Sequence, residues 1–377
     1  MEQSIQKRVS NADIAELLAR EAERRDGILQ RAFRRAARSA FLWPEQATDI
    51  FHAGRPLTEL KSIGPFMAKE LQIWLKTPRL KVPPAPMIRR NFLTLADARI
   101  LLAKKARQLP KLQGDLQMHT QWSDGSGRIS DMAAAAAERG YHYIAITDHS
   151  KGLKIAGGIN ERDLARQGAE INKVNQSIAR NGGEIAVLRS IEMNLNPRGE
   201  GDMDPAALRQ LDLVLGSFHS ALRTREDQTE RYLRALGNPD IQILGHPRGR
   251  IYNYRLGLKA DWERVFAEAS RLDKAVEIDA YPDRQDIDVR LLKIARRSGT
   301  RISIGTDAHH PWQLDFIDLA LAAVLLAKIP FERVINFMSL SQLRTWVAGM
   351  REREDRRTKP RSPKLAVKRG SPEEATS

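Results

Sequence analysis

The sequence predicts an α/β protein in which a small all-α domain precedes a larger unit of parallel strands. Through residues 113–350, short apolar runs rich in β-branched residues alternate with helical patterns, which is typical of parallel strands covered by helices on both faces. Seven such runs are present, at residues 114–119, 143–147, 185–195, 211–219, 241–246, 275–280 and 301–309. Periodicity alone allows them to close into a barrel or to form an open wound sheet.

The flanking segments differ from this central unit. Residues 10–41 contain no Pro and carry apolar residues at helical spacing, which predicts two helices with Ser10 or Asn11 as the cap. A Pro-rich stretch follows at 77–90, and the chain beyond residue 350 is charged and contains Pro. We therefore expect a helical domain at 1–76, a linker at 77–112, the strand-containing domain at 113–350 and a basic disordered tail at 351–377.

Composition excludes several classes of protein. The chain has 377 residues, of which 42% are hydrophobic, so two or three domains can each bury a core. It has no cysteine, which excludes disulfides, thiolate metal sites and a cysteine nucleophile. No apolar run approaches the roughly 20 residues of a membrane span, and the first residues lack the apolar core of a signal peptide. We expect a cytoplasmic protein without membrane contact, and the sequence leaves its oligomeric state open.

Positive charge is concentrated in the two flanks. Residues 1–112 contain 22 Lys and Arg against 11 Asp and Glu, and residues 351–377 contain 9 against 5. Residues 113–350 contain 31 of each. A neutral body between cationic ends is suited to chemistry on a polyanion, because Lys and Arg displace counterions from phosphates. The alternative is an arginine-rich composition that serves only solubility.

Nearly every predicted strand ends in a side chain that can bind a metal ion. These residues are Gln117, His119, Asp148, His149, Glu192, His219, His246, Asp307 and His309. Five of the eight histidines of the chain belong to this set. In a βα barrel the C-terminal strand ends meet at one face, so these side chains would converge there. Imidazole and carboxylate without thiolate suit two or three ions of zinc, manganese or iron.

Six segments carry a resemblance to a known family. They are DLQMHTQWSDG (115–125), YIAITDHS (143–150), SIEMNL with Glu192, GSFHS (216–220), GHPRGR (245–250) and GTDAHH (305–310). In this order they resemble the motifs of the PHP phosphoesterase family, which includes histidinol phosphatases and a domain of several bacterial DNA polymerases. The resemblance covers 113–345 and implies a distorted (β/α)7 barrel.

The resemblance also implies which residues bind metals. The first metal position corresponds to Gln117, His119, Glu192 and Asp307, the second to Glu192, His219 and His246, and the third to Asp124, His149 and His309. Glu192 would bridge two ions, and Glu192, Asp307 and Asp124 would be the catalytic carboxylates around a metal-activated hydroxide. Residue 117 departs from the usual His-x-His opening. Because an amide oxygen is an uncharged and weaker ligand than imidazole, we expect the first metal to bind less tightly.

Two arginines lie just beyond predicted strand ends, where they could bind phosphate. Arg248 follows His246 by two residues, and Arg284 lies in the segment YPDRQD after another strand. A guanidinium group can bind phosphate through two parallel hydrogen bonds. A structural salt bridge is the alternative for each.

The N-terminal region contains a second motif. Residues 57–75 resemble a helix-hairpin-helix, with Ser62 in place of the first Gly and Gly64 at the second. In such a hairpin the free N–H groups at a helix start hold a phosphate without reading sequence, so Ser62, Gly64 and Lys69 are the expected DNA contacts. A packing module is the alternative. Residues 1–76 resemble the N-terminal DNA-binding part of bacterial family X DNA polymerases, whereas a polymerase palm is missing.

These observations favour a metal-dependent phosphoric ester hydrolase that acts on DNA ends, as a 3′-5′ exonuclease or a 3′-phosphatase. The expected partner is DNA, bound largely without sequence preference. One alternative is a small-molecule phosphatase of the histidinol-phosphatase type, which would not require the basic N-terminal domain. A second alternative is a DNA-binding protein without catalysis, which only Gln117 favours.

Overall fold

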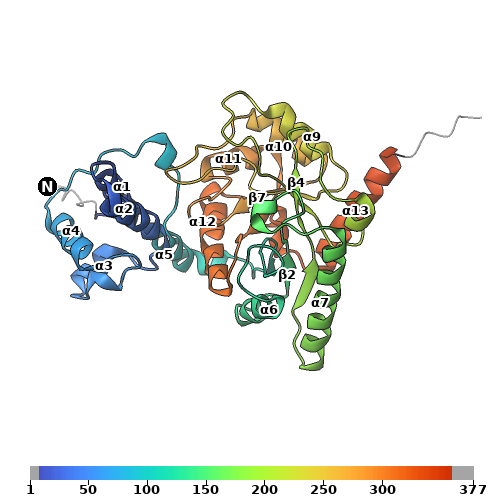
Figure 1. Cartoon of the computed structure of the whole chain (residues 1–377), viewed down its shortest axis with the longest axis horizontal. Helices are drawn as coiled ribbons and strands as arrows, with labels where there is room; N and C mark the ends of the chain where they lie inside the picture. The colour runs from blue at the N-terminus through green and yellow to red at the C-terminus, as the bar shows by residue number, and fades with distance from the viewer. Residues whose placement is uncertain (1–7, 359–377) are drawn as a thin grey trace, which may run out of the picture.

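The computed structural model describes residues 8–358, in which a group of helices is followed by a larger α/β unit (Figure 1). The helical part contains α1 (Asn11–Glu23), α2 (Gly27–Ser39), α3 (Ala47–His52) and α4 (Pro65–Lys76). Ser10 caps α1, because its hydroxyl accepts from the Asp13 N–H while the Asp13 carboxylate accepts from the Ser10 N–H. Because α1 and α2 both lie within residues 10–41, the prediction of two helices there is confirmed.

The helical part has its own core, and one residue of the α/β unit belongs to it. Its buried side chains include Ile14, Leu18, Phe33 and Trp43. Tyr252, from a loop of the α/β unit, is 1% exposed and packs its ring against Phe41 at 4.7 Å and Phe92 at 5.4 Å between centroids. This shared cluster ties the helical part to the loop that follows β6.

The α/β unit contains eight parallel strands in two sheets. One sheet has the order β1-β2-β3 and the other β4-β5-β6-β7-β8. The strands are β1 (Gly114–Asp115), β2 (Tyr143–Ile146), β3 (Ala186–Arg189), β4 (Glu192–Leu195), β5 (Leu215–Phe218), β6 (Ile243–Leu244), β7 (Ala275–Asp279) and β8 (Arg301–Gly305). Each of the seven predicted runs contains a strand, and the run 185–195 is interrupted at residues 190–191 and contains both β3 and β4. The prediction of parallel strands is confirmed.

Helices follow most of the strands and cover the sheets. They are α6 (Ile129–Glu138), α7 (Glu161–Arg180), α8 (Pro205–Leu208), α9 (Thr229–Gly237), α10 (Trp262–Arg271), α11 (Val289–Ser298) and α12 (Ile317–Ala327). The largest core forms where strand residues such as Val276 and Ile304 meet helix residues such as Phe266 and Leu292. None of the helices within residues 8–358 combines the length and apolarity that crossing a bilayer requires.

Two segments outside the strand region contain helices that the sequence pattern does not indicate. The segment expected as a linker includes α5 (Leu95–Lys105), whose Leu95 and Ala98 pack against Leu319 and Ala322 of α12. The expected tail begins inside α13 (Leu340–Thr358), which buries Trp346 against the α/β unit, and residues 359–377 lie outside the described residues. Each helix buries a few apolar residues on one side against the α/β unit, and this tertiary packing stabilises it.

Candidate metal centre

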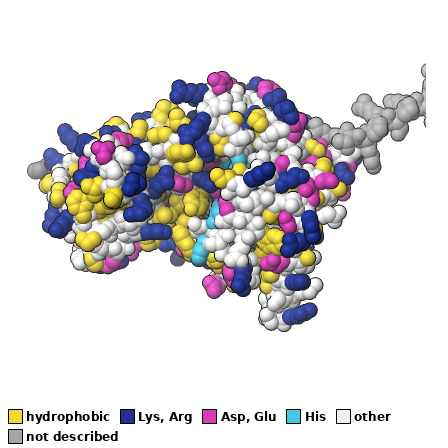
Figure 2. All heavy atoms as spheres, viewed as in Figure 1, with side chains coloured by type: hydrophobic (Ala, Val, Ile, Leu, Met, Phe, Trp, Pro, Cys, Tyr) yellow, Lys and Arg dark blue, Asp and Glu magenta, His cyan; other side chains and the backbone are white. Residues whose placement is uncertain are grey.

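The C-terminal strand ends bring the predicted metal ligands to one region of the molecule. His119 and His149 follow β1 and β2, and Glu192 lies three residues after the end of β3, where β4 begins. His219, His246, Asp307 and His309 follow β5, β6 and β8. Figure 2 shows histidine side chains, coloured cyan, inside a hollow of the surface, with Lys and Arg side chains around it. Residues separated by almost 200 positions therefore share one site.

Two overlapping groups of side chains have the spacing that a metal ion requires. One consists of His119, Asp124, His149 and His309, and the other of His149, Glu192 and His219. Within each group the potential ligand atoms lie within 4.8 Å of one another. The His119 ring stacks between His149 and His309, with centroids 4.3 and 4.4 Å away.

Glu192 is at the centre of the second group. Its Oε2 lies 3.0 Å from His149 Nδ1 and 3.5 Å from His119 Nε2. Its Oε1 lies 3.3 Å from His219 Nε2 and 2.5 Å from His246 Nε2. Both carboxylate oxygens thus face imidazole nitrogens, which is the arrangement expected of a carboxylate shared between two cation positions.

Several of these buried atoms lack a hydrogen bond of acceptable geometry within the described residues. The set comprises both ring nitrogens of His119, His149 Nδ1, His219 Nε2 and Glu192 Oε2. Leaving a buried polar atom without a partner costs about 1–3 kcal/mol, so a concentration of them requires an explanation. Imidazole and carboxylate atoms that face one another without hydrogen bonding suit divalent cations as their common partner.

The electrostatics of the group are consistent with cation binding. Burial alone would lower the pKa of His246, but the neighbouring Glu192 carboxylate raises it to about 10. Burial opposes ionisation of Asp124, yet its hydrogen bond with His309 lowers the pKa of this carboxyl to about 2. Burial also acts on Glu192, where the histidines around it hold the pKa well below its usual value. The carboxylates therefore stay ionised, and a cation would replace the proton that His246 otherwise holds.

Asp307 connects the group to one of the two predicted phosphate-binding arginines. Its Oδ1 lies 3.0 Å from His119 Nε2, and its Oδ2 lies 2.9 Å from Arg284 Nη1. The Arg284 side chain is 34% exposed, so it can also reach a bound substrate. Arg248 lies elsewhere: its Nη1 donates to Asp288 Oδ2 at 3.0 Å and its Nη2 to the Leu256 carbonyl.

Gln117 is buried beside a carboxylate that the sequence reasoning did not single out. Its side-chain amide lies against Glu277, and in the orientation that satisfies both groups the amide nitrogen lies 2.6 and 2.9 Å from the two carboxylate oxygens. Glu277 also accepts a hydrogen bond of 2.8 Å from the His246 backbone N–H. Burial raises the pKa of Glu277 well above its usual value. The available signal was the pattern AVEIDA, in which two acidic residues, Glu277 and Asp279, interrupt an otherwise apolar strand.

Asp148, another strand-end carboxylate, holds the loop of residues 120–123 in place through hydrogen bonds. It accepts hydrogen bonds from the Thr120 N–H at 2.7 Å, from the Ser123 hydroxyl at 2.5 Å and from Gln167 Nε2 at 2.7 Å. Residues 120–123 lead directly to Asp124. Asp148 therefore orients the loop that carries a predicted ligand.

The segment expected to form the DNA-binding hairpin has one full helix. Residues 57–59 form a single 3-10 turn, and α4 begins after Gly64, which serves as its N-cap. Ser62 occupies the left-handed region with φ of 66°, and its hydroxyl accepts from that of Ser39 at 2.8 Å. Lys69 is exposed on α4. Lys61, in the turn before α4, lies over the ring of Trp312, three residues after His309.

Comparison with known proteins agrees with this architecture. The model of the PHP domain family matches residues 115–358. The chain is 33% identical over 241 residues to the DNA polymerase/3'-5' exonuclease PolX of Bacillus subtilis, a match that covers 64% of this chain and 42% of that protein. It is 30% identical over 227 residues to a probable phosphatase of Photobacterium profundum, with 57% of this chain and 85% of that protein covered.

A histidinol phosphate phosphatase of Lactococcus lactis, solved with zinc, L-histidinol and phosphate, shows a weaker likeness. It aligns at a TM-score of 0.41 and 18% identity over 57% of this chain and 94% of that structure, which is too low to carry weight.

The chain belongs to the PHP domain family. It is a metal-dependent phosphoesterase. The matched part spans less than half of the Bacillus subtilis protein.

Proposed function

We propose that this phosphoesterase acts on DNA ends, as a 3′-5′ exonuclease or a 3′-phosphatase. The observation that carries the proposal is the approach of the N-terminal turn to the candidate metal centre. Lys61 lies beside Ser62 and Gly64 and contacts Trp312, close in sequence to the predicted ligand His309. A strand held by the turn would have its end near the histidines. The similarity to a protein named as a 3′-5′ exonuclease supports the same conclusion.

A row of arginines on α2 extends the cationic surface. Arg31, Arg34, Arg35 and Arg38 are exposed, and their spacing puts them on one face of the helix. Arg38 lies near enough to Asp283 for its positive charge to oppose the rise that burial causes in the pKa of that carboxyl group. Asp283 directly precedes Arg284 in the chain. Positive charge thus continues from the helical part towards the candidate metal centre, as a polyanionic substrate requires.

We also infer that the two sheets are parts of one distorted (β/α)7 barrel. Bridges connect them at both ends, between His149 and Glu192 and between Met118 and Ala308, both parallel. In this interpretation β3 and β4 are one strand with an irregular centre. A closed ring of strands would account for the convergence of their C-terminal ends.

In the proposed mechanism each side chain has a defined task. The residues that would hold two or three divalent cations are His119, Asp124, His149, Glu192, His219, His246, Asp307 and His309, and Gln117 would support the first position from beside Glu277. Bound cations supply Lewis acidity to phosphoryl oxygens and acidify the attacking water. Arg284, held by Asp307, would bind a non-bridging phosphate oxygen and orient phosphorus towards the cluster.

The test uses purified protein with manganese on 5′-labelled oligonucleotides that end in a 3′-hydroxyl or a 3′-phosphate. We expect stepwise shortening or loss of the terminal phosphate, and we expect Glu192→Gln to abolish either reaction. Glu263→Gln, which neutralises an exposed carboxylate on α10, is the matched control and should retain activity. Intact oligonucleotides together with hydrolysis of small phosphomonoesters would reject the proposal.

That rejecting outcome corresponds to the second candidate, a small-molecule phosphatase. The match to a probable phosphatase, 85% of which is covered, favours it. The two candidates share the predicted metal ligands and differ in whether the N-terminal residues contribute to substrate binding. Comparing kcat/KM for an oligonucleotide and for histidinol phosphate separates them.

A further inference from the structure

An arginine-lined groove opens where the segment after the Pro-rich stretch meets the loop that follows β6. It has a volume of about 350 Å³ and lies between residues 87–92 and 248–256, with the start of α11 on one side. Asp288 is the one acidic side chain in its lining. Five arginines line it: Arg90, Arg248, Arg250, Arg255 and Arg290. We call these five residues and the space between them the arginine groove.

The positive charge of the arginine groove is only partly compensated. Asp288 Oδ2 accepts from Arg248 at 3.0 Å and from Arg250 at 3.3 Å, so one carboxylate serves two guanidinium groups. Arg90 and Arg290 are exposed, and neither forms an ion pair within residues 8–358. Burial lowers the pKa of Arg255, as do the nearby charges of Arg284 and Arg223. An anion in the groove would relieve this repulsion.

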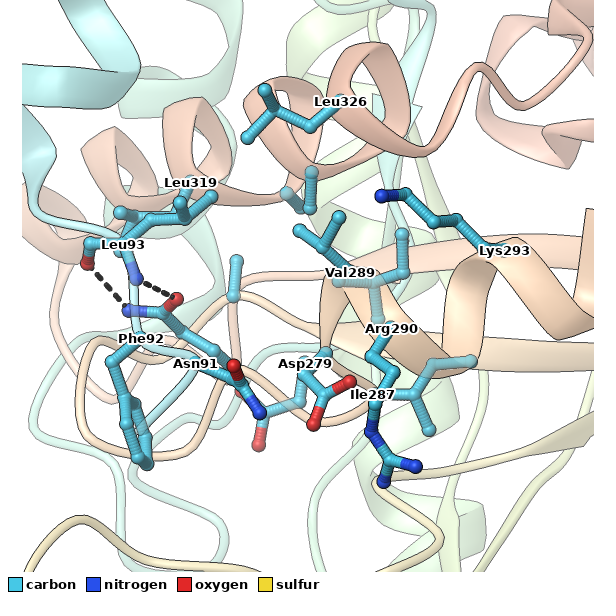
Figure 3. Close-up of a pocket in the computed structure, with 16 residues that line it drawn as sticks. Asn91, Phe92, Leu93, Asp279, Ile287, Val289, Arg290, Lys293, Leu319 and Leu326 are labelled. Atoms are coloured by element: carbon cyan, nitrogen blue, oxygen red, sulfur yellow. Dashed lines mark hydrogen bonds between the residues drawn. The ribbon is translucent and has the colours of Figure 1, made fainter. Parts of the chain in front are cut away.

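The Arg290 side chain is oriented so that it can bind an anion in the groove. It also borders a neighbouring cavity of about 250 Å³ whose wall includes Leu319 and Leu326. Figure 3 shows the Arg290 side chain pointing away from that apolar wall. In the same view Asn91 and Phe92 lie across from Arg290, and both also line the arginine groove. The guanidinium group is thus directed away from apolar surroundings, as expected for a group that binds a charged ligand.

The groove is connected to the candidate metal centre through its own hydrogen bonds. Arg250 Nε donates to the Arg284 carbonyl at 2.7 Å, and Arg284 Nη1 lies 2.9 Å from Asp307. The loop that carries Arg248, Arg250 and Arg255 begins just after His246. It is anchored by Tyr252 in the core of the helical part and by the Asn253 N–H, which donates to the Ile88 carbonyl at 3.2 Å.

We propose that the arginine groove is a second phosphate subsite, which binds the phosphodiester backbone of a nucleic-acid strand whose end lies in the metal centre. This rests on the proposed function and specifies its substrate as an oligonucleotide that reaches beyond the scissile bond. Guanidinium groups bind phosphate through paired hydrogen bonds, and the exposed Arg90 and Arg290 are the two that a phosphate can reach directly. Arg248 and Arg250, which share Asp288, add positive charge behind them. Tyr254, next to Arg255 in the chain and 53% exposed, has the Arg223 guanidinium 4.5 Å from its ring centre, and a base could stack on this exposed ring.

The test is binding of a 5′-fluorescein-labelled single-stranded 12-mer to the full chain in EDTA, followed by anisotropy at several salt concentrations. The variant is Arg90→Gln/Arg290→Gln, which neutralises the two exposed groove arginines. We expect about tenfold weaker binding. The slope of log K against log salt should become less steep by about 1.4, because each phosphate contact on a single strand contributes about 0.7.

Arg297→Gln is the control for the Arg290 half of the double variant, since it removes one positive charge from an exposed position of α11 outside the groove. We expect its affinity and salt slope to equal those of the wild type, and a thermal melt shows whether each variant is folded. Unchanged affinity and slope in a folded Arg90→Gln/Arg290→Gln protein would overturn the subsite. Because binding is measured without hydrolysis, a wild type that binds through the groove but leaves DNA ends intact would reject only the proposed reaction.

Discussion

The Lys61 ammonium group lies 4.5 Å from the centre of the Trp312 ring. This contact joins the turn before α4 to the segment that follows the predicted ligand His309, across about 250 residues of sequence. Trp312 remains 44% exposed, and its ring also packs edge-to-face against Phe316 at 5.3 Å and lies 6.3 Å from the His310 ring. An exposed indole beside a lysine provides both stacking and charge for a single strand.

We expect Trp312→Ala to weaken binding of single-stranded DNA by about 5- to 150-fold, because stacking of one base contributes about 1–3 kcal/mol. Trp312→Phe retains a ring and should lose much less. Fluorescence anisotropy with a labelled 12-mer measures both. Equal affinity of the alanine variant and the wild type would exclude Trp312 from the binding surface.

Arg284→Ala should lower kcat/KM for bis(p-nitrophenyl) phosphate by about 10²–10³-fold, the usual effect of losing one donor to a reacting group. The physical reason is that Arg284 is the partly exposed cation held against Asp307. Arg284→Lys should restore part of the activity. Arg166→Ala, on the exposed side of α7, controls for loss of positive charge, and a similar decrease in that variant would contradict the assignment.

Removing metal ions should destabilise the protein. Dialysis against EDTA leaves the buried atoms around Glu192 without a shared partner, so we expect a lower Tm that returns when manganese is added. At a free metal concentration 100 times Kd, binding stabilises the native state by about 2.7 kcal/mol. Glu192→Gln should reduce this metal-dependent shift in differential scanning calorimetry. A Tm that is indifferent to EDTA and manganese would argue against cation binding.

Glu277→Leu should destabilise the protein, because it leaves the Gln117 amide and the His246 N–H without their acceptor. Each buried donor left unpaired costs about 1–3 kcal/mol. The double variant Gln117→Leu/Glu277→Leu should recover part of the loss, since one donor is removed with its acceptor. Urea unfolding of the single and double variants measures this coupling. Purely additive effects would show that the two side chains do not interact.

Tyr252→Ala should lower the free energy of unfolding by about 3–5 kcal/mol, as expected for removal of a buried aromatic side chain. The loss should be accompanied by faster proteolysis near residues 249–257, because Tyr252 anchors this loop in the helical part. Tyr254→Ala, two residues away and 53% exposed, is the matched control and should change stability by less than about 1 kcal/mol. Equal effects of the two substitutions would contradict the anchoring role.

The sequence by itself determined the seven strand runs, a helix capped by Ser10 or Asn11, and the set of imidazole and carboxylate side chains at the strand ends. These features follow from local chemistry, because apolar periodicity, capping residues and strand ends are properties of short segments. Membership of the PHP domain family follows from the same motifs, taken in order.

Only the tertiary structure decided which side chains meet. It places Gln117 beside Glu277 and Lys61 over Trp312. It also places Arg248 in the arginine groove, paired with Asp288, and not beside the histidines. It also stabilised α5 on α12, where the local pattern indicated a linker. The physical reason is that such contacts depend on the geometry of distant segments, and residue type and spacing along the chain do not specify which of these segments meet.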